Sequence, residues 1–290
     1  HFVESCETAT GEKFNWDNYL PGYSTMKEKE RVVFFLRDGL SAAEKERMTA
    51  YGADMSKYLD SGNEARIKKA YESRDPRLQM AVITPYAQYN GASSGIAHTY
   101  TLRWPYRGSD SAEPFDIRTD TNDKFYYLWR KFVPEGLEQT ERDTYGLDIP
   151  LIRYAEVLLL KAEALNEWGS THESEAIRCV NEVRRRAGHV ELNNATYPAT
   201  KVNGQSDLRE RIRNEYYWEI GGEDSMYFHE LRWGTWKDKK FDNNRNGLMQ
   251  MWGETTYTWY WLGDQCWSWP IPAKEMEMNS NLEQNEGWIN

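Results

Sequence analysis

Three short patterns place chemically active residue types close together, and the first is typical of a hydrolase. Gly91-Ala-Ser93-Ser-Gly95 has the spacing of a nucleophile elbow, in which a serine stands on a tight turn between a strand and a helix. Pro85 interrupts the preceding segment, and residues 96–102 have no helical period. A Gly/Ser-rich loop is therefore the better interpretation, and His98 nearby is expected to form hydrogen bonds in a loop rather than act as a base.

The second and third patterns concern metals. Asp242-Asn-Asn244-Arg-Asn246-Gly247 resembles the start of a calcium loop, but the twelfth position is Gly253 and Glu254 comes one place late. A polar turn accounts for it better. The 5 histidines have no HExxH or paired spacing, and the 3 cysteines (Cys6, Cys179, Cys266) form no CxxC. We therefore predict no metal site, no cofactor and no catalytic residue.

Aromatic residues are the compositional outlier, with 13 Trp and 19 Tyr in an otherwise polar chain. Such side chains have an apolar face and a polar tip, which suits the binding of a sugar ring or a peptide. They are equally suited to filling the core of a chain with few Leu and Ile, and both explanations stay open. Trp129, Trp168, Trp218 and Trp233 lie in or beside regular elements and are expected in the core. The candidate ligand-binding residues are Trp16, Tyr19 and Tyr23, in a loop at 15–25, and Tyr86, Tyr89, Asn90, Arg103, Trp104 and Tyr106, in a segment at 85–114 that is expected to be a long loop or a set of weak hairpins.

The bulk properties exclude some classes of function. The chain has 290 residues, with 36 basic against 46 acidic side chains, so nucleic acid is not an expected partner. No apolar run approaches the length of a membrane span. The start, His1-Phe-Val-Glu-Ser-Cys6, has no secretory signal, and a chain that begins with His is expected to be a mature or cut product.

The second half of the chain is predicted to be helical. Asp148 as N-cap and Pro150 in the first turn begin a helix that Gly169 ends, and a capping box from Ser170 to Glu173 opens the next one. Two antiparallel helices with so short a link form an αα-hairpin of the tetratricopeptide kind. The buried stripe of the first helix is Leu151, Ile152, Ala155, Leu158, Leu159, Ala162 and Leu165, and that of the second is Ala176, Val180, Val183 and Ala187.

The other elements are shorter. Helices are expected at 42–51, 63–73, from Asp207 to Gly221 and at 223–233, a strand at 78–84 and an edge hairpin at 255–261. The chain therefore divides into a loop-rich mixed region at 1–145 that carries the ligand-binding loops, a helical core at 146–240, and a hairpin with an extended tail at 241–290. All three are expected to be parts of one domain.

Four segments in the same order resemble the SusD/RagB family of outer-membrane nutrient-binding lipoproteins. They cover roughly residues 75–290, and the long second block is highly specific. The segments are Asp75-Pro-Arg77-Leu78 with Tyr89-Asn-Gly91; Arg153-Tyr-Ala-Glu156 through Asn166, with Asn181-Glu-Val-Arg184-Arg-Arg186-Ala-Gly188; Leu208-Arg-Glu210-Arg211 through Leu231-Arg-Trp233-Gly234; and the tail Trp269-Pro-Ile-Pro-Ala-Lys-Glu275 through Gly287-Trp288.

The resemblance implies a mainly α fold, an α/α superhelix of tetratricopeptide-like hairpins with long loops and a few short β-hairpins. It implies a protein without enzymatic activity that binds an oligosaccharide or polysaccharide on the outer face of the outer membrane and delivers it to a TonB-dependent SusC-like transporter. Family members are about twice this long, so the chain resembles a C-terminal half without the N-terminal lipid anchor, and Cys6 is not expected to be lipidated. The alternatives are peptide capture of the RagB type, a helical protein-interaction scaffold, and a hydrolase that uses Ser93.

Overall fold

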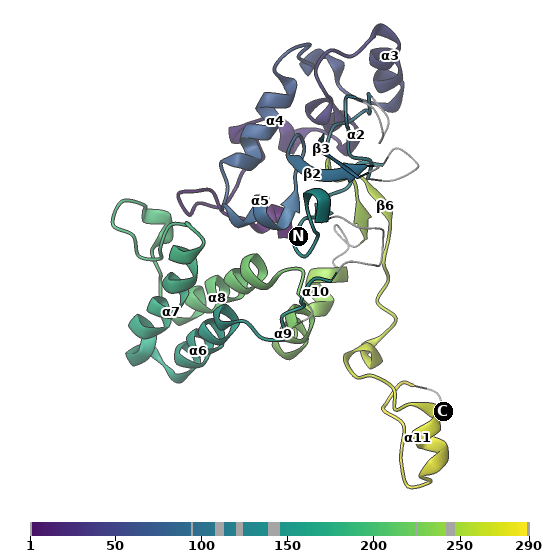
Figure 1. Cartoon of the computed structure of the whole chain (residues 1–290). Helices are drawn as coiled ribbons and strands as arrows, with labels where there is room; N and C mark the ends of the chain where they lie inside the picture. The colour runs from purple at the N-terminus through teal and green to yellow at the C-terminus, as the bar shows by residue number, and fades with distance from the viewer. Residues whose placement is uncertain are drawn as a thin grey trace. The chain divides into compact units, whose positions relative to one another are not determined.

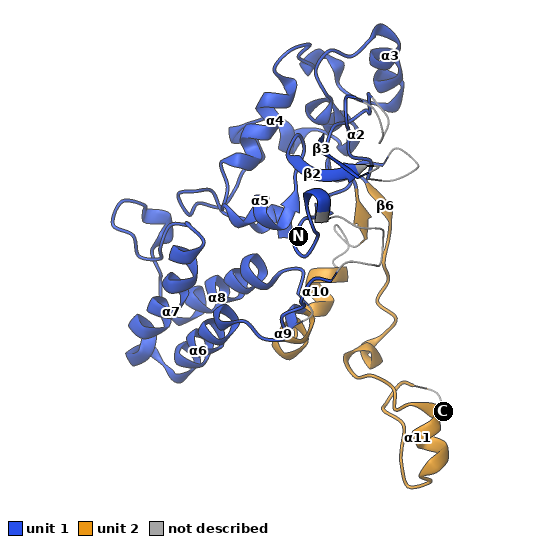
Figure 2. Ribbon diagram, in the orientation of Figure 1, with its two compact units in different colours: residues 1–226, 250–254 blue, residues 227–249, 255–290 orange. Residues whose placement is uncertain are grey.

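The computed structural model describes residues 2–93, 95–107, 113–119, 124–138, 146–223, 225–241 and 247–288. This part of the chain is mainly helical, with short antiparallel strand pairs, which confirms the predicted fold class (Figure 1). It forms two compact units, residues 1–226 with 250–254, and residues 227–249 with 255–290 (Figure 2). The division at residues 145 and 240 expected from the sequence stays a prediction. None of the described helices has the length and apolar character that crossing a membrane requires.

The helices and strands have the following bounds. The helices are α1 (Phe2–Ser5), α2 (Glu28–Arg31), α3 (Ala42–Tyr51), α4 (Asn63–Glu72), α5 (Arg77–Ala81), α6 (Tyr154–Trp168), α7 (Glu173–Arg186), α8 (Gln205–Ile220), α9 (Ser225–Trp233), α10 (Trp236–Phe241) and α11 (Ala273–Met278). The strands are β1 (Val82–Ile83), β2 (Gln88–Ser93), β3 (Ile96–Thr101), β4 (Leu128–Trp129), β5 (Leu248–Met249) and β6 (Thr255–Tyr257). β1 pairs with β4, β2 with β3, and β5 with β6.

The first unit has a core rich in aromatic side chains. Trp252 is fully buried, with its ring centroid 5.1 Å from that of Trp104 and 6.1 Å from that of Phe35. Residues 250–254 reach this core from outside the main run of the unit, and the Met251 N–H donates to the carbonyl of Phe125 at 2.9 Å. The core therefore includes a short segment far along the chain from the rest.

A helix occupies most of the segment in which the sequence predicts a strand at 78–84. α5 begins directly after Pro76, and the Asp75 carboxylate accepts the Arg77 N–H at 2.9 Å. An aspartate that accepts an N–H two residues on, followed by a proline, favours the start of a helical turn. Only Val82 and Ile83 form a strand, so the strand prediction is wrong for the residues before them.

β2 and β3 form an antiparallel hairpin within the predicted long loop. Gln88 lies opposite Thr101, and Ser93 lies opposite Ile96. Because β3 begins three residues after Ser93, a strand follows the serine where a nucleophile elbow requires a helix. The structure therefore agrees with the rejection of the hydrolase motif.

α6 and α7 form the predicted helical hairpin, but both helices begin elsewhere than expected. α6 starts at Tyr154, so neither Asp148 nor Pro150 caps it. Residues Ser170–His172 form a 3₁₀ turn before α7, and no side chain caps either element, so the predicted capping box is wrong. Charge pairs and packing against α8 stabilise the hairpin in place of the caps.

The structure buries only some of the four tryptophans that the sequence predicts in the core. Trp218 is buried at 3% exposure, as predicted, and Trp233 is half-buried. Trp129 is 46% exposed and Trp168 is 75% exposed, so the prediction is wrong for these two. Trp168 stands at the end of α6, where its ring stacks on that of His172 with centroids 4.2 Å apart and otherwise faces solvent.

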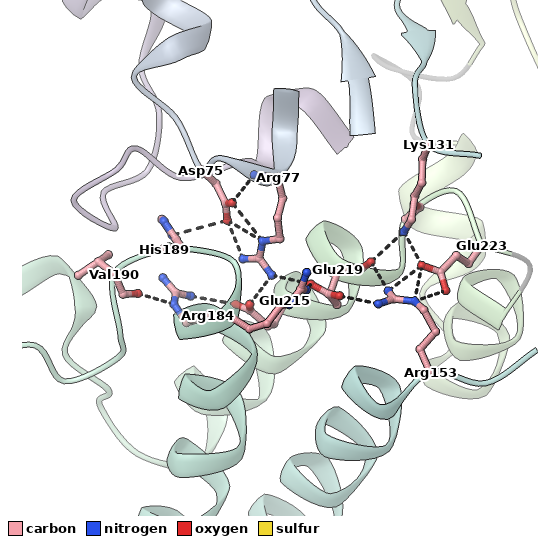
Figure 3. A network of polar contacts seen from close by, with 12 residues as sticks. Asp75, Arg77, Lys131, Arg153, Arg184, His189, Val190, Glu215, Glu219 and Glu223 are labelled. Carbon is pink, nitrogen blue, oxygen red and sulfur yellow. Dashed lines mark hydrogen bonds and ion pairs between the residues drawn. The ribbon is translucent and has the colours of Figure 1, made fainter. Parts of the chain in front are cut away.

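A buried network of charges joins α5 to the helical hairpin and α8 (Figure 3). Arg77 binds Asp75 at 2.6 Å and Glu215 at 2.6 Å, and all three side chains are almost fully buried. Arg184 of α7 contacts the other oxygen of Glu215 at 3.0 Å and reaches Glu7 at 2.7 Å. Glu215 thus holds two guanidinium groups from elements far apart in sequence.

The network continues along α8. Arg153, just before α6, binds Glu219 at 2.8 Å and Glu223 at 2.7 Å. Glu223 also receives the ammonium group of Lys131. At the other end, His189 lies 3.2 Å from Glu7 and 3.7 Å from Asp75. Each of these carboxylates therefore has a cationic or imidazole partner.

The partners determine the charge state of the acids. Burial disfavours ionisation of Asp75, but hydrogen bonds from Arg77 outweigh it, and the pKa of Asp75 lies below its ordinary value. Burial likewise opposes ionisation of Glu7 and Glu223, yet their pKa values are lowered by bonds from His189 and Arg184, and from Arg153 and Lys131 respectively. These acids are ionised in the folded protein at neutral pH.

Removal of the central guanidinium tests the network. We expect Arg77→Met to lower the free energy of unfolding by about 3–5 kcal/mol, because it leaves buried carboxylates without their partner. Urea denaturation at neutral pH measures this. The matched control is Arg185→Met, which breaks the exposed pair with Glu191 at 2.8 Å and should change the free energy of unfolding far less, because solvent screens this pair. Equal losses in the two variants would contradict the role given to Arg77.

The same network predicts a pH dependence. Carboxyl groups with lowered folded-state pKa values stabilise the fold above their unfolded values, 3.8 for Asp75 and 4.5 for Glu7 and Glu223, and lose this effect as pH falls through the folded values. The free energy of unfolding should therefore fall on acidification below about pH 4.5. Asp75→Asn should show a smaller fall than the unmodified chain. A stability that rises between pH 5 and pH 3 would refute this reading.

Candidate functional site

Most of the aromatic residues predicted to contact a ligand lie in the core of the first unit. The Trp16 ring lies 4.9 Å from that of Tyr23 and nearly parallel to it, and its Nε1 donates to Glu4 at 2.9 Å. Their ring faces therefore pack against protein and present no platform to solvent. The members of this buried group are Trp16, Tyr23, Tyr86, Tyr89 and Trp104, each exposed by 8% or less.

The hydroxyl groups of the buried tyrosines are also used internally. Tyr89 donates to the carbonyl of Pro134 at 2.5 Å, and Tyr86 donates to the carbonyl of Phe35 at 2.7 Å. Burial, with the nearby Glu64 and Asp38 carboxylates, raises the pKa of Tyr86 well above its usual value. The phenol stays protonated and acts as a donor, so these residues are structural.

An open hollow lies between α4 and the β2–β3 hairpin. Its volume is about 330 Å³, within the range of small-ligand pockets. Arg103 and Tyr86, both predicted ligand residues, line it, although Tyr86 is only 3% exposed. The lining residues are Asp38, Glu64, Ala65, Lys68, Tyr86, Gln88, Thr101 and Arg103.

Two acidic residues, Asp38 and Glu64, form the acidic wall of the hollow, and backbone hydrogen bonds hold them in place. The two oxygens of Asp38 accept the N–H groups of Gly62, at 2.8 Å, and Glu64, at 3.0 Å. Glu64 in turn accepts the Asp38 N–H at 3.2 Å. This reciprocal arrangement ties the start of α4 to the loop before α3 and holds both carboxylates in place.

Arg103 lies beside the two acids. Its Nη1 donates to Asp116 at 2.9 Å, and Asp116 is fully buried. Its Nε is buried, makes no hydrogen bond within the described residues, and lies 3.6 Å from Glu64 in an ion pair. The hollow is therefore bordered by one guanidinium and two carboxylates at fixed positions.

The polar surface continues from the hollow along the hairpin. Side chains of residues paired across a hairpin share a face, and the face alternates along each strand. Asn90 and Thr99 are paired, two places from the pair of Gln88 and Thr101, so both pairs lie on the same face. The Thr99 hydroxyl donates to Asn90 at 3.5 Å, and Asn90 is exposed. The structure therefore brings Asn90 and Arg103 to one polar surface.

The two remaining candidates lie elsewhere. Tyr19 is half-buried and its ring stacks on that of Phe14, with centroids 5.5 Å apart. Tyr106 is half-buried, and its hydroxyl accepts the Thr119 N–H at 2.7 Å. Neither lines the hollow.

The hollow holds hydrogen-bond donors and acceptors of both charges. Its two carboxylates, Asp38 and Glu64, both accept backbone N–H groups. Among the residues that the structure describes, no group of three or more His, Cys, Asp or Glu side chains could hold a metal ion. The segment at 242–246 that resembles a calcium loop lies outside the described residues.

Several residues of the site were not predicted from the sequence, among them Asp38, Glu64, Lys68, Gln88 and Thr101. They come from a loop, a helix and two strands that meet only in the fold. The spacing of Asp38 and Glu64 carries no motif, and a lysine on an exposed helix face is ordinary. Only the alternation of the hairpin could have linked Gln88 to Asn90.

Comparisons with known proteins agree with one another. The model of the SusD family matches residues 3–288. The chain is 32% identical to SusD-like protein P38 of Formosa agariphila over 139 residues, which are 48% of this chain and 24% of that protein. It is 28% identical to the starch-binding protein SusD of Bacteroides thetaiotaomicron over 161 residues, 55% of this chain and 25% of that protein.

Similarity at the level of fold extends over nearly the whole chain. A solved structure of a SusD-like protein from Bacteroides fragilis superimposes with a TM-score of 0.58 at 18% identity. The match covers 99% of this chain and 46% of the solved chain. The aligned part thus spans a quarter of the two sequence relatives and less than half of the solved structure.

The burial of the aromatic candidates gives a direct prediction. We expect Trp16→Ala and Trp104→Ala each to lower the free energy of unfolding by about 3–5 kcal/mol, because each leaves a cavity in a packed core. Chemical denaturation followed by circular dichroism measures it. Trp168→Ala removes the same side chain from a surface position and should stay within about 0.5 kcal/mol of the unmodified chain. A small effect at Trp16 or Trp104 would show that its ring is not packed.

Proposed function

The chain belongs to the SusD family, and we propose that it binds an oligosaccharide or polysaccharide in the hollow between α4 and the β2–β3 hairpin. One observation carries the proposal. Arg103, held by Asp116, places a guanidinium in the lining beside the fixed carboxylates of Asp38 and Glu64. Sugar hydroxyls both donate and accept hydrogen bonds, so a surface with both characters at fixed positions suits them.

The proposed binding depends on hydrogen bonds more than on aromatic stacking. Gln88, Asn90 and Thr99 extend the polar surface beyond the hollow, which provides room for more than one unit of a chain-like ligand. The aromatic candidates near it are buried or turned to internal partners. A ligand held mainly by hydrogen bonds to an open surface binds with modest affinity and leaves easily.

We further propose that the protein acts by capture and release, without chemistry. It would act at the outer face of the outer membrane and deliver its ligand to a TonB-dependent SusC-like transporter. The membership of the family and the names of the starch-binding and SusD-like relatives support this role.

Substitutions in the hollow test the binding site. We expect Gln88→Ala and Arg103→Gln to weaken binding of whichever polysaccharide the chain retains by roughly 10-fold each, since each removes one or two hydrogen bonds. Affinity gel electrophoresis against a panel of soluble polysaccharides identifies the ligand, and calorimetry gives the affinity. A peptide digest is tested in parallel.

Arg47→Gln is the matched control, because Arg47 lies exposed on α3, outside the lining, and its loss should leave affinity unchanged. If a polysaccharide binds equally well to all variants, the site lies elsewhere on the chain. Binding of peptides with no binding of any glycan would move the function to peptide capture. Reducing ends that appear during incubation with the ligand would show catalysis and reject the proposal.

A further inference from the structure

The hollow between α4 and the β2–β3 hairpin is lined by charges of both signs, and each of them already has a partner within the chain. The acidic members are Asp38 and Glu64, and the basic members are Lys68 and Arg103. A charged group of a ligand would need a partner of opposite sign there, because an ion taken out of water without one is costly. The partners of these side chains therefore indicate which class of glycan the hollow accepts.

The N-terminus of α4 is a natural place for an anion, but the chain fills it with a carboxylate of its own. Unpaired N–H groups and the helix dipole attract negative charge to the start of a helix. Here the two oxygens of Asp38 accept the N–H groups of Gly62, at 2.8 Å, and Glu64, at 3.0 Å. An acidic substituent on a sugar would find these donors taken.

Arg103 is the side chain best suited to hold an acidic sugar, and it is committed as well. Arginine binds carboxylates through N–H groups that lie in one plane. The Nη1 of Arg103 donates to the fully buried Asp116 at 2.9 Å, and its Nε forms an ion pair with Glu64 at 3.6 Å. The positive charge of Arg103 is therefore balanced before a ligand arrives.

Lys68 is the cation of the described lining that a ligand can recruit most readily. Its ammonium group lies 3.5 Å from Glu72, one turn further along α4, and both side chains are about half exposed, at 46% and 50%. Such a pair is weak and can open. An anion that drew Lys68 away would still face Asp38 and Glu64, which backbone hydrogen bonds hold in place. Two fixed charges would then repel it, and one mobile charge would attract it.

We propose that the hollow selects uncharged glycans and rejects those that carry carboxylate or sulfate groups. This selectivity rests on the proposed function, since it concerns the same site, and it adds the class of the ligand. Sugar hydroxyls donate to the remaining lone pairs of Asp38 and Glu64 and accept from Lys68 and the amide of Gln88. The same two carboxylates that hold a neutral ligand repel an acidic one, so rejection is built into the lining.

Ligands that differ only in charge test the proposal. Affinity gels with starch, xyloglucan, galactomannan and mixed-linkage β-glucan identify a neutral polysaccharide that the 290-residue chain retains, and alginate, polygalacturonate and chondroitin sulfate form the acidic panel. The retained polysaccharide is then oxidised at its primary hydroxyl groups to carboxylates, and calorimetry compares the two forms. We expect the oxidised form to bind roughly 10-fold more weakly, and its methyl ester, which has no charge, to recover most of the affinity.

The ionic strength gives a readout that needs no substitution. Salt screens the repulsion between charges and has little effect on hydrogen bonds to neutral groups. Affinity for the neutral polysaccharide should therefore stay constant between low and high salt, whereas affinity for the oxidised form should rise with salt.

Glu64→Gln tests the source of the rejection. The amide oxygen can still accept the Asp38 N–H, which Glu64 accepts at 3.2 Å, but the negative charge is gone. We expect the ratio of the affinities for the neutral and the oxidised polysaccharide to fall several-fold. Glu46→Gln is the matched control, because it makes the same change in net charge at an exposed position of α3 outside the lining, and it should leave the ratio unchanged.

Three results would overturn the selectivity and leave the proposed function standing. They are equal affinity for the neutral and the oxidised form, an unchanged ratio in a folded Glu64→Gln variant, and retention of an acidic polysaccharide that Gln88→Ala abolishes. Retention of no polysaccharide at all would instead reject the proposed function, and the selectivity with it. Should Glu64→Gln not fold, the comparison of the oxidised form with its methyl ester on the unmodified chain still decides.

Discussion

The fold of the first unit depends on Glu215, a fully buried carboxylate that holds Arg77 and Arg184 at once. These arginines belong to α5 and α7, and Glu215 belongs to α8, so one side chain positions three elements. Charges in a low-dielectric interior are costly unless each is paired, and the network meets this condition over Asp75, Glu219 and Glu223. Few alternative packings of the helices would pair the same set, so the network favours one arrangement. The hollow relies on this indirectly, because α5 continues into β1 and the hairpin that follows.

The secondary structure predicted from the sequence is right for helices with a clear periodicity. It is wrong where contacts between distant segments determine the structure. The αα-hairpin is predicted correctly because its apolar residues recur locally, and the helix at 42–51 because Gly52 marks its end. The strand predicted at 78–84 is mostly α5, because Leu78 and Val82 suit either structure and the choice depends on Asp75 and its partner Arg77. The predicted start of α6 is too early because Leu151 continues an apolar stripe that the inner face of the helix does not use.

Long-range contacts, which the sequence does not reveal, also determine which residues reach the site. Trp and Tyr were plausible contacts by type, but their burial depends on neighbours such as Trp252, far along the chain. Arg103 and Asn90, predicted as ligand contacts, lie on one polar surface in the fold, and their contact with a ligand stays a prediction. The acidic wall could not be foreseen, since Asp38 and Glu64 meet through backbone groups that no motif marks. In this chain, aromatic composition reports the core more than the binding surface.

The return of residues 250–254 to the core of the first unit affects how the protein is made. A ribosome delivers the chain from its N-terminus, and domains generally fold as they emerge. Here Trp252 completes an aromatic core whose other members, Phe35 and Trp104, are synthesised much earlier. That core stays open to solvent until synthesis has passed residue 254, and its apolar surface needs shielding from other chains in the interval. Holding chaperones are therefore expected to protect the nascent chain until residue 254 has emerged.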